Sequence, residues 1–127
     1  MKKIFIAYCL LFASNSFAFD SFTKEDIALQ STFTIITIVD YGQTLNIAKH
    51  PNTWKETNLI LGEHPKEKAV NIYFPVAIGA HAVVSYLIPN SCQIFSIKCR
   101  TIWQYSSIAV ELKPVISNFA IGINSTF

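Results

Sequence analysis

Apolar residues gather in three long stretches of the chain, and the most apolar of them covers residues 66–88. It follows Pro65, which suits the first position of a helix, and it ends before Pro89, which cannot continue one. At about 1.5 Å of rise per residue, its length matches a hydrocarbon core of about 30 Å. A single histidine, His81, interrupts its apolar middle. The pattern therefore predicts a membrane-length helix with one polar residue inside.

The other two stretches, 24–48 and 100–122, carry polar residues at steps of three and four, which form one stripe along a helix. The first is preceded by Thr23 and has Asp26 three residues later, the spacing of a capping box in which aspartate replaces the usual glutamate. The second contains Pro114, which we expect to kink it. Helices that are apolar outside and polar along one seam suit lipid outside and protein inside. The predicted fold class is all-α: a small bundle of three transmembrane helices.

Residues 1–18 have the layout of a signal peptide. Two lysines precede an apolar run over residues 4–12, and Ser16 to Ala18 fits the small-x-small pattern of a cleavage site. We therefore expect residues 19–127 to form the mature, three-helix membrane domain. The alternative is an uncleaved anchor, which needs about 20 apolar residues and finds only about 15 here.

The predicted topology follows from export of the N-terminus. It places the loop 49–65 in the cytoplasm and the connector 89–100 in the periplasm, and lysines in and near the loop agree with the positive charge expected inside. Cys92 and Cys99 lie in the connector, where an oxidising compartment favours a disulfide between them. Two buried thiols are the alternative. The expected location is a bacterial inner membrane with the mature N-terminus in the periplasm.

Composition narrows the class of protein further. Hydrophobic residues make up 51% of the chain and charged residues only 14%, which is more apolar than an ordinary soluble domain. The net charge of +2 and the lack of a basic block argue against nucleic acid as a partner. The expected partners are the lipid bilayer and either another membrane protein or further copies of this chain. No cofactor or metal is predicted.

Two motifs resemble those of an uncharacterised family of short membrane proteins from proteobacteria and their phages. They are Asp-x-x-Gln-Thr at residues 40–44 and Glu-x-Asn-x-x-Leu-Gly at residues 56–62. The resemblance covers most of residues 19–127 and departs from the family at Leu59, where its members carry proline. It implies a membrane protein with this fold, and it implies no activity.

The polar seam holds the residues most able to do chemistry. Asp40, His81 and Glu111 are side chains that bind metals or move protons, and ionisable groups inside a membrane are candidates for function. Counted along the helices, Asp40 and His81 differ in depth by about 10 Å, which is too far for one metal site. The sequence therefore predicts a ladder of polar contacts between the helices. Its predicted members are Gln30, Thr37, Asp40, Gln43, Thr44, His81, Ser85, Gln104, Ser107, Glu111 and Asn118.

We expect these residues to pair within two levels of the bundle. The predicted partners of Asp40 are Gln43, Thr44 and Asn118, and those of His81 are Ser85, Ser107 and Glu111. The simplest interpretation is that such bonds hold the helices together in a small inner-membrane accessory or interaction protein of phage or prophage origin. The alternatives are a proton or ion relay, a soluble periplasmic bundle with a wet core, and a metal-dependent membrane enzyme. The enzyme would use Asp40, His81 and Glu111, with Glu56 approaching from the loop.

Overall fold

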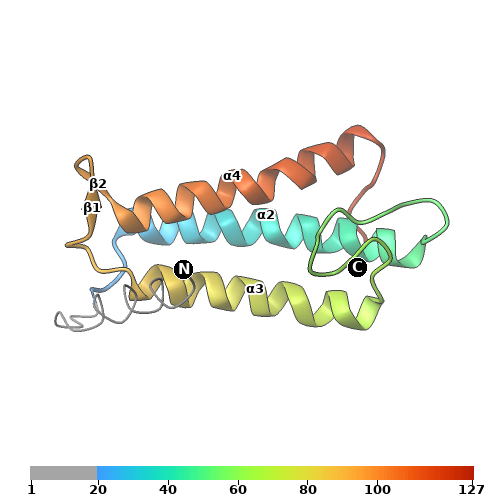
Figure 1. Ribbon diagram of the computed structural model, residues 1–127, viewed down its shortest axis with the longest axis horizontal. Helices are drawn as coiled ribbons and strands as arrows, with labels where there is room; N and C mark the ends of the chain where they lie inside the picture. Colours follow the sequence, from blue (N-terminus) through green and yellow to red (C-terminus); the bar gives the residue numbers. More distant parts are fainter. Residues whose placement is uncertain (1–19) are drawn as a thin grey trace, which may run out of the picture.

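The computed structural model describes residues 20–127, and the predicted signal peptide lies outside this range. Three helices account for most of the described chain: α2 (Lys24–Lys49), α3 (Glu67–Leu87) and α4 (Cys99–Ala120). A short antiparallel hairpin of β1 (Gln93–Ile94) and β2 (Ile97–Lys98) connects α3 to α4 at one end of the bundle (Figure 1). The prediction of an all-α fold with three helices is confirmed.

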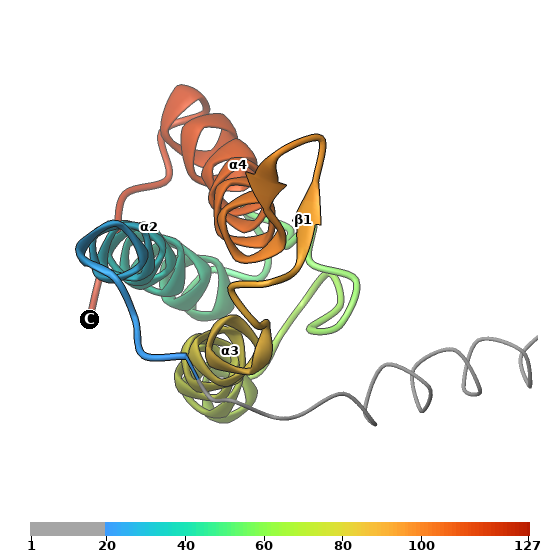
Figure 2. The same ribbon diagram turned by 90° about the vertical axis from the view of Figure 1, so that its left-hand side faces the viewer.

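The helices run side by side, and α2 is the central one. It packs along both α3 and α4, whereas α3 and α4 contact each other sparsely (Figure 1, Figure 2). The start of α2, the end of α3 and the start of α4 lie at one end of the bundle, which we call the hairpin end. The opposite end holds residues 50–66 and the C-terminal residues 121–127, and we call it the loop end.

Local sequence explains how the hairpin end is fixed. The predicted capping box is present: Thr23 Oγ1 accepts a hydrogen bond from the Asp26 amide at 3.2 Å, and the Thr23 amide donates to the Asp26 carboxylate at 2.8 Å. A disulfide between Cys92 and Cys99 closes the hairpin, whose turn residues both have positive φ. Hydrogen bonds and a covalent bond therefore act together at this end.

The bundle buries more polar side chains than apolar ones, which is unusual for a soluble domain. Within residues 20–127, 11 buried side chains are polar or charged and only 8 are hydrophobic. The outward faces are apolar instead: Ile35 on α2, Val76 on α3 and Val110 on α4 are each more than half exposed. The stripes of polar residues in the sequence therefore face one another inside the bundle.

Hydropathy separates the three helices. Among the described residues, only α3 is long and apolar enough to cross a membrane by length and composition. The prediction of three transmembrane helices is thus not supported for α2 and α4 by this measure. The reason lies in their stripes, because buried polar residues such as Gln43 in α2 and Gln104 in α4 lower the mean hydropathy of the helix that carries them.

At the loop end, two segments fold back onto α2. In the loop, Glu56 is buried whereas Leu59 at the tip is 99% exposed. The C-terminal residues cross α2 at Gly42, whose carbonyl oxygen accepts from the Thr126 amide at 3.0 Å. A Cβ at position 42 would approach the Cβ of Ser125 to 2.7 Å, so this crossing needs glycine. The small apolar core of the bundle also lies at this end and consists of Leu45, Val70 and Phe74.

Candidate functional site

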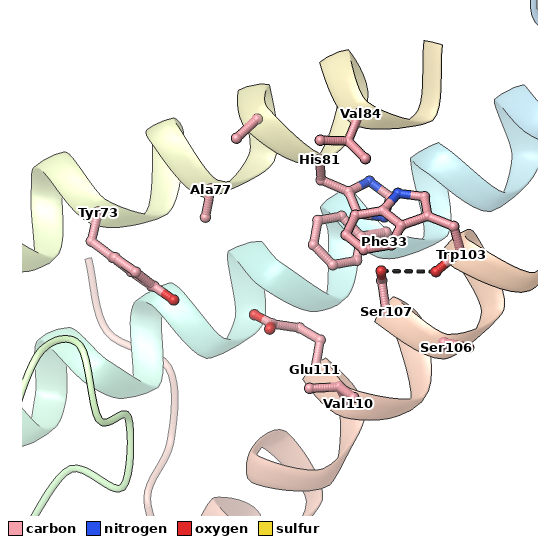
Figure 3. A pocket seen from close by; sticks show the side chains of 11 residues that line it. Phe33, Tyr73, Ala77, His81, Val84, Trp103, Ser106, Ser107, Val110 and Glu111 are labelled. Atoms are coloured by element: carbon pink, nitrogen blue, oxygen red, sulfur yellow. Dashed lines mark hydrogen bonds between the residues drawn. The ribbon is translucent and has the colours of Figure 1, made fainter. Parts of the chain in front are cut away.

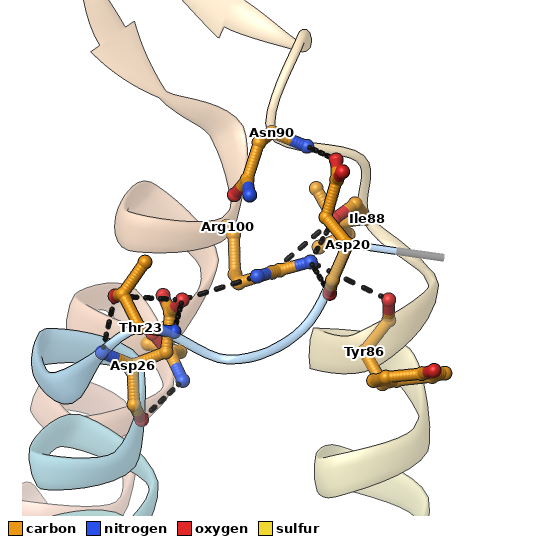
Figure 4. A network of polar contacts seen from close by, with 8 residues as sticks. Asp20, Thr23, Asp26, Tyr86, Ile88, Asn90 and Arg100 are labelled. Atoms are coloured by element: carbon orange, nitrogen blue, oxygen red, sulfur yellow. Dashed lines mark hydrogen bonds and ion pairs between the residues drawn. The ribbon is translucent and has the colours of Figure 1, made fainter. Parts of the chain in front are cut away.

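A buried arginine organises the hairpin end. Arg100, at the start of α4, is fully buried and forms an ion pair with Asp26 at 3.1 Å (Figure 4). Its guanidinium also donates to the carbonyl oxygens of Ile88 at 2.7 Å and Asp20 at 3.2 Å, and it lies over the ring of Phe22. Carbonyl groups at a helix C-terminus lack partners within the helix, so the arginine stabilises the end of α3. The Asp26 carboxylate balances the charge of Arg100. Because no charge is left for a ligand, we interpret this network as structural.

A cleft opens between α3 and α4, with α2 as its floor (Figure 3). Its volume is about 450 Å³, and we call it the apolar cleft because most of its lining is apolar. The lining residues are Phe33, Tyr73, Ala77, Ala80, His81, Val84, Trp103, Ser106, Ser107, Val110 and Glu111. The cleft exists because α3 and α4 pack on α2 rather than on each other.

His81 lies in the wall of the apolar cleft as the middle of three stacked rings. The centroid of its ring lies 3.7 Å from that of Phe33 and 5.3 Å from that of Trp103. Nδ1 lies 2.8 Å from Oε1 of Gln30, an atom that only accepts, so Nδ1 carries the proton and donates it. The other nitrogen, Nε2, is buried and finds no partner among residues 20–127. His81 is therefore a fixed residue with one unused acceptor.

A second cavity, of about 510 Å³, adjoins the apolar cleft on the side of the loop end. The two share Tyr73, Val110 and Glu111 in their linings. We call the second the acid cavity, because α2, the loop and α4 each contribute one carboxylate: Asp40, Glu56 and Glu111. Lys113 also lines it but forms no ion pair within the described part of the chain.

The carboxylates of the acid cavity differ in how they are satisfied. Glu56 accepts hydrogen bonds from two backbone amides of its own loop at 2.8 and 2.9 Å, and from the hydroxyl of Thr44 at 2.9 Å. Asp40 is only 7% exposed, yet its carboxylate has no hydrogen-bond donor or cation among the described residues. Its interactions with Glu111 and Glu56 are repulsive. An unmatched buried carboxylate is costly unless it takes up a proton or meets a cation, so this cavity can accept a cation.

The predicted ladder forms with partners that differ from those expected. Asn118 donates to Oε1 of Gln43 at 3.2 Å, and Thr44 donates to Glu56, so neither side chain bonds with Asp40 as predicted. The His81 ring pairs with Gln30 rather than with a predicted side chain, and of its predicted partners Ser85 bonds only to the His81 carbonyl oxygen, at 2.8 Å. The expected pairs between side chains are therefore wrong at both levels, and only the contact of Ser85 with His81 forms, through the backbone.

The remaining ladder residues form two kinds of hydrogen bond, and Ser85 takes part in both. Gln104 on α4 donates to the carbonyl oxygen of Asp26 on α2 at 3.1 Å, and the indole of Trp103 donates to Ser85 on α3 at 3.1 Å, so these side chains bridge helices. Other hydroxyls donate to the carbonyl oxygen four residues earlier in their own helix, and these belong to Thr37, Ser85 and Ser107. These bonds to the helix's own backbone do not prevent bridging, because the Ser85 oxygen also accepts from Trp103 and the Thr37 side chain also interacts with Glu111 on α4.

Sequence reasoning misses two residues that the structure makes prominent. From sequence alone, Arg100 is one more charge of the connector and Trp103 an aromatic residue near a helix end. The available signal was a pair of opposite charges, Asp26 and Arg100, in the first turns of two helices that start at the same end of the bundle. Trp103 offers no comparable signal, because its role depends on packing against His81.

The candidate chemical residues do not converge on one centre. Asp40 and Glu111 line the acid cavity, whereas His81 lines only the apolar cleft. No group of three His, Cys, Asp or Glu side chains in residues 20–127 is arranged to hold a metal ion. Comparisons with family models, with curated proteins and with solved structures find no match. The function is therefore argued from the geometry of the two cavities and of the outer surface.

Proposed function

We propose that the chain is a small accessory protein that works inside a bacterial inner membrane, with all three helices in the bilayer. The observation that carries the proposal is the reversed burial, with polar side chains inside and apolar ones outside. In water, this arrangement leaves large apolar faces exposed without gain, because burial of apolar surface drives folding. In lipid it is favourable, since the apolar faces meet acyl chains and the polar contacts hold the helices together.

Two details of the outward faces support the bilayer. α3 has the length and composition of a membrane span, and only 22% of its most apolar 18 residues are buried. The core helix of a soluble protein, in contrast, is mostly buried. On α2, Ser31 and Thr32 are exposed, and their hydroxyls donate to carbonyl oxygens four residues earlier at 2.8 and 2.9 Å. Such bonds remove the need for water at a hydroxyl, which suits a surface in contact with lipid.

We infer that the hairpin end faces the periplasm and the loop end the cytoplasm. The disulfide at the hairpin end is favoured by an oxidising compartment. Lysines cluster at the loop end, at positions 49, 55, 66 and 68, as the positive-inside rule expects. Leu59 and Phe95 are 99% and 95% exposed at the tips of the loop and the hairpin, where each would reach one surface of the bilayer.

Within the membrane, the interior supports a binding role rather than catalysis. Its amide side chains are committed to structural contacts, as in the pairs of Gln43 with Asn118 and Gln30 with His81. The space that remains open is the apolar cleft with the adjoining acid cavity. We therefore propose that the chain acts by binding a component of the membrane or another membrane protein.

A proton relay is the second candidate, on one observation. Glu111 lines both cavities and so stands between Asp40 and His81. In a relay, Glu111→Gln and His81→Phe would each abolish the phenotype of the gene at wild-type expression, because each interrupts the same chain of proton carriers. If His81→Phe keeps the wild-type phenotype, the relay is ruled out and binding remains.

Extraction tests the membrane placement directly. We expect the full-length protein, expressed in bacteria, to stay in the membrane pellet during an alkaline carbonate wash and to be released by detergent. A soluble periplasmic protein expressed in the same cells serves as the control for complete washing. Release of the protein by carbonate alone would contradict the proposal.

A further inference from the structure

We propose that the acid cavity binds the ammonium group of an amphipathic amine whose apolar chain lies in the apolar cleft. The two cavities alone define the site, which rests on the proposed function only for the natural source of the amine, an aminophospholipid of the surrounding bilayer. Three properties of the cavities point to this ligand: their charge, the number of available acceptors, and the way they adjoin each other.

The charge of the acid cavity is unbalanced. Asp40 is 93% buried, and none of its described neighbours donates a hydrogen bond or supplies a cation to its carboxylate. Glu111 shares the cavity, and Lys113 in its wall pairs with neither acid within residues 20–127. Buried carboxylates are normally paired, so a ligand with positive charge stabilises Asp40 when it enters, and it also offsets the repulsion between Asp40 and the half-buried Glu111.

The available acceptors favour an ammonium group over a metal ion. Glu56 already uses both carboxylate oxygens for the loop amides and Thr44. Asp40 and Glu111 remain as acceptors, and Glu111 has only the Thr37 hydroxyl as a hydrogen-bond partner in the described chain. Two carboxylates suit a primary ammonium, which brings three donors of its own. Tyr73 and Glu111 point into the same space from α3 and α4 (Figure 3), and an aromatic wall also suits a cation.

The shape of the site indicates a chain attached to the ammonium. The acid cavity adjoins the apolar cleft at Tyr73, Val110 and Glu111, and the cleft adds about 450 Å³ of mostly apolar space. Small side chains on α3, Ala77 and Ala80, leave the room that an alkyl chain needs. A free polyamine would fill the acid cavity and leave the apolar cleft unused, so an amphiphile matches the whole site better.

Fluorescence quenching tests the proposal with the full-length protein in a nonionic detergent. A Trp54→Phe background leaves Trp103, in the wall of the apolar cleft, as the single tryptophan. The probes are decylamine, decanol and decanoic acid, each brominated at the terminal carbon, because bromine quenches indole on contact. We expect the amine to quench Trp103 at about a tenfold lower mole fraction than the alcohol, with the acid weakest, because only the ammonium forms charge-assisted bonds in the acid cavity.

Matched variants locate the ammonium and the chain. Asp40→Asn and Glu111→Gln keep the shape of the cavity, and each should abolish the preference for the amine over the alcohol. Glu25→Gln, at an exposed acid in the first turn of α2, should keep the preference. Ala80→Leu should weaken amine and alcohol alike by filling the cleft. Equal quenching by amine and alcohol in the wild type, or an unchanged preference in the Asp40→Asn, Glu111→Gln double variant, would overturn the proposal.

Competition with unbrominated ligands identifies the source of the amine. Displacement of the brominated amine by phosphatidylethanolamine and not by phosphatidylcholine supports a lipid. Equal displacement by spermidine overturns the choice of an amphiphile, and equal displacement by calcium overturns the choice of an ammonium. Because the assay runs in detergent, a failure here leaves the carbonate result standing. Release by carbonate would likewise refute the membrane placement without touching the binding site.

Discussion

The two ends of the bundle bury their charges in opposite ways. At the hairpin end, the Asp26 carboxylate lies 3.1 Å from the Arg100 guanidinium, and backbone carbonyl oxygens accept the remaining donors. At the loop end, Asp40 and Glu111 share a cavity in which no described residue supplies a matching cation. The buried charges at the hairpin end are paired, whereas the carboxylates of Asp40 and Glu111 at the loop end have no cationic partner among the described residues.

This difference separates what holds the bundle together from what it can bind. Removing one partner of a buried ion pair strongly destabilises the fold, because the other charge stays buried without a partner. We therefore call the pair of Asp26 and Arg100 a clamp. An unmatched set of acids is tolerated only where water or a ligand reaches it, and both cavities extend to Glu111. We therefore interpret the hairpin end as the structural end of the molecule and the loop end as its binding end.

The largest effect is expected from breaking the clamp. Arg100→Met keeps most of the side-chain volume but leaves the Asp26 carboxylate and the last carbonyl groups of α3 without a donor. We expect a loss of about 3–5 kcal/mol in the free energy of unfolding in mild detergent, followed by circular dichroism. Adding Asp26→Asn should restore part of it, because the stranded charge is gone. A loss as small as that of Lys24→Met, an exposed cation at the same end, would show that the network is not a clamp.

At the acid cavity the same kind of change should have the opposite sign. Asp40→Asn removes a buried charge that Glu111 and Glu56 repel, and it strands no partner. We expect a gain in stability on the order of 1 kcal/mol in the absence of added amine, measured by the same unfolding assay. A loss of similar size would mean that Asp40 supports the fold, and the contrast between the two ends would disappear.

Gly42 tests the contact of the C-terminal residues with α2, and Gly79, in the middle of α3, is its control. Gly42→Ala places a methyl group against Ser125 and should push the C-terminal residues off α2, whereas a Cβ at Gly79 of α3 meets open space. In both helices alanine is intrinsically better than glycine by about 1 kcal/mol. We expect Gly79→Ala to raise the melting temperature and Gly42→Ala to gain less or to lose stability. Faster proteolysis of the C-terminal residues in Gly42→Ala, and not in Gly79→Ala, would show the displacement directly.

The smallest effect is expected at the exposed ion pair of the loop. Lys55 lies 3.0 Å from Glu63, and its ammonium holds the pKa of that carboxyl below the usual range. This contribution is present above the pKa of the unfolded carboxyl and is lost as the pH falls through the lower folded value. Because both side chains are about two thirds exposed, water screens the pair. We expect Lys55→Gln to leave the melting temperature unchanged within error at neutral pH, and a drop comparable to that of Arg100→Met would contradict this.

Features that depend on neighbours in the chain could be predicted from the sequence. The capping box of Thr23 and Asp26 is a local pattern, and the three helices follow from the spacing of apolar residues and from Pro65 and Pro89. The pairing of Cys92 with Cys99 also joins residues that are close in sequence.

The partners of the polar residues could not be predicted in the same way. Whether His81 meets Gln30 or Ser107 depends on how far α2 and α4 slide and rotate against α3, and a shift of one residue turns a helix face by about 100°. Glu56 reaches Thr44 only because the loop folds back, which no spacing along the helices indicates. Tertiary packing therefore decides which acid has hydrogen-bond donors and which has none among the described residues.

The central claim, that the apolar faces of this bundle meet lipid, is tested most directly by one lysine at two depths. Val76 is 62% exposed near the middle of α3, and Ala69 is exposed near its start. In a bilayer, Val76→Lys should oppose insertion by about 2.5–3.5 kcal/mol and sharply reduce the carbonate-resistant fraction. Ala69→Lys should leave that fraction unchanged, because its lysine reaches the membrane surface. Equal carbonate-resistant fractions for the two variants and the wild type would contradict the claim, since an exposed residue of a bundle in water tolerates lysine at either depth.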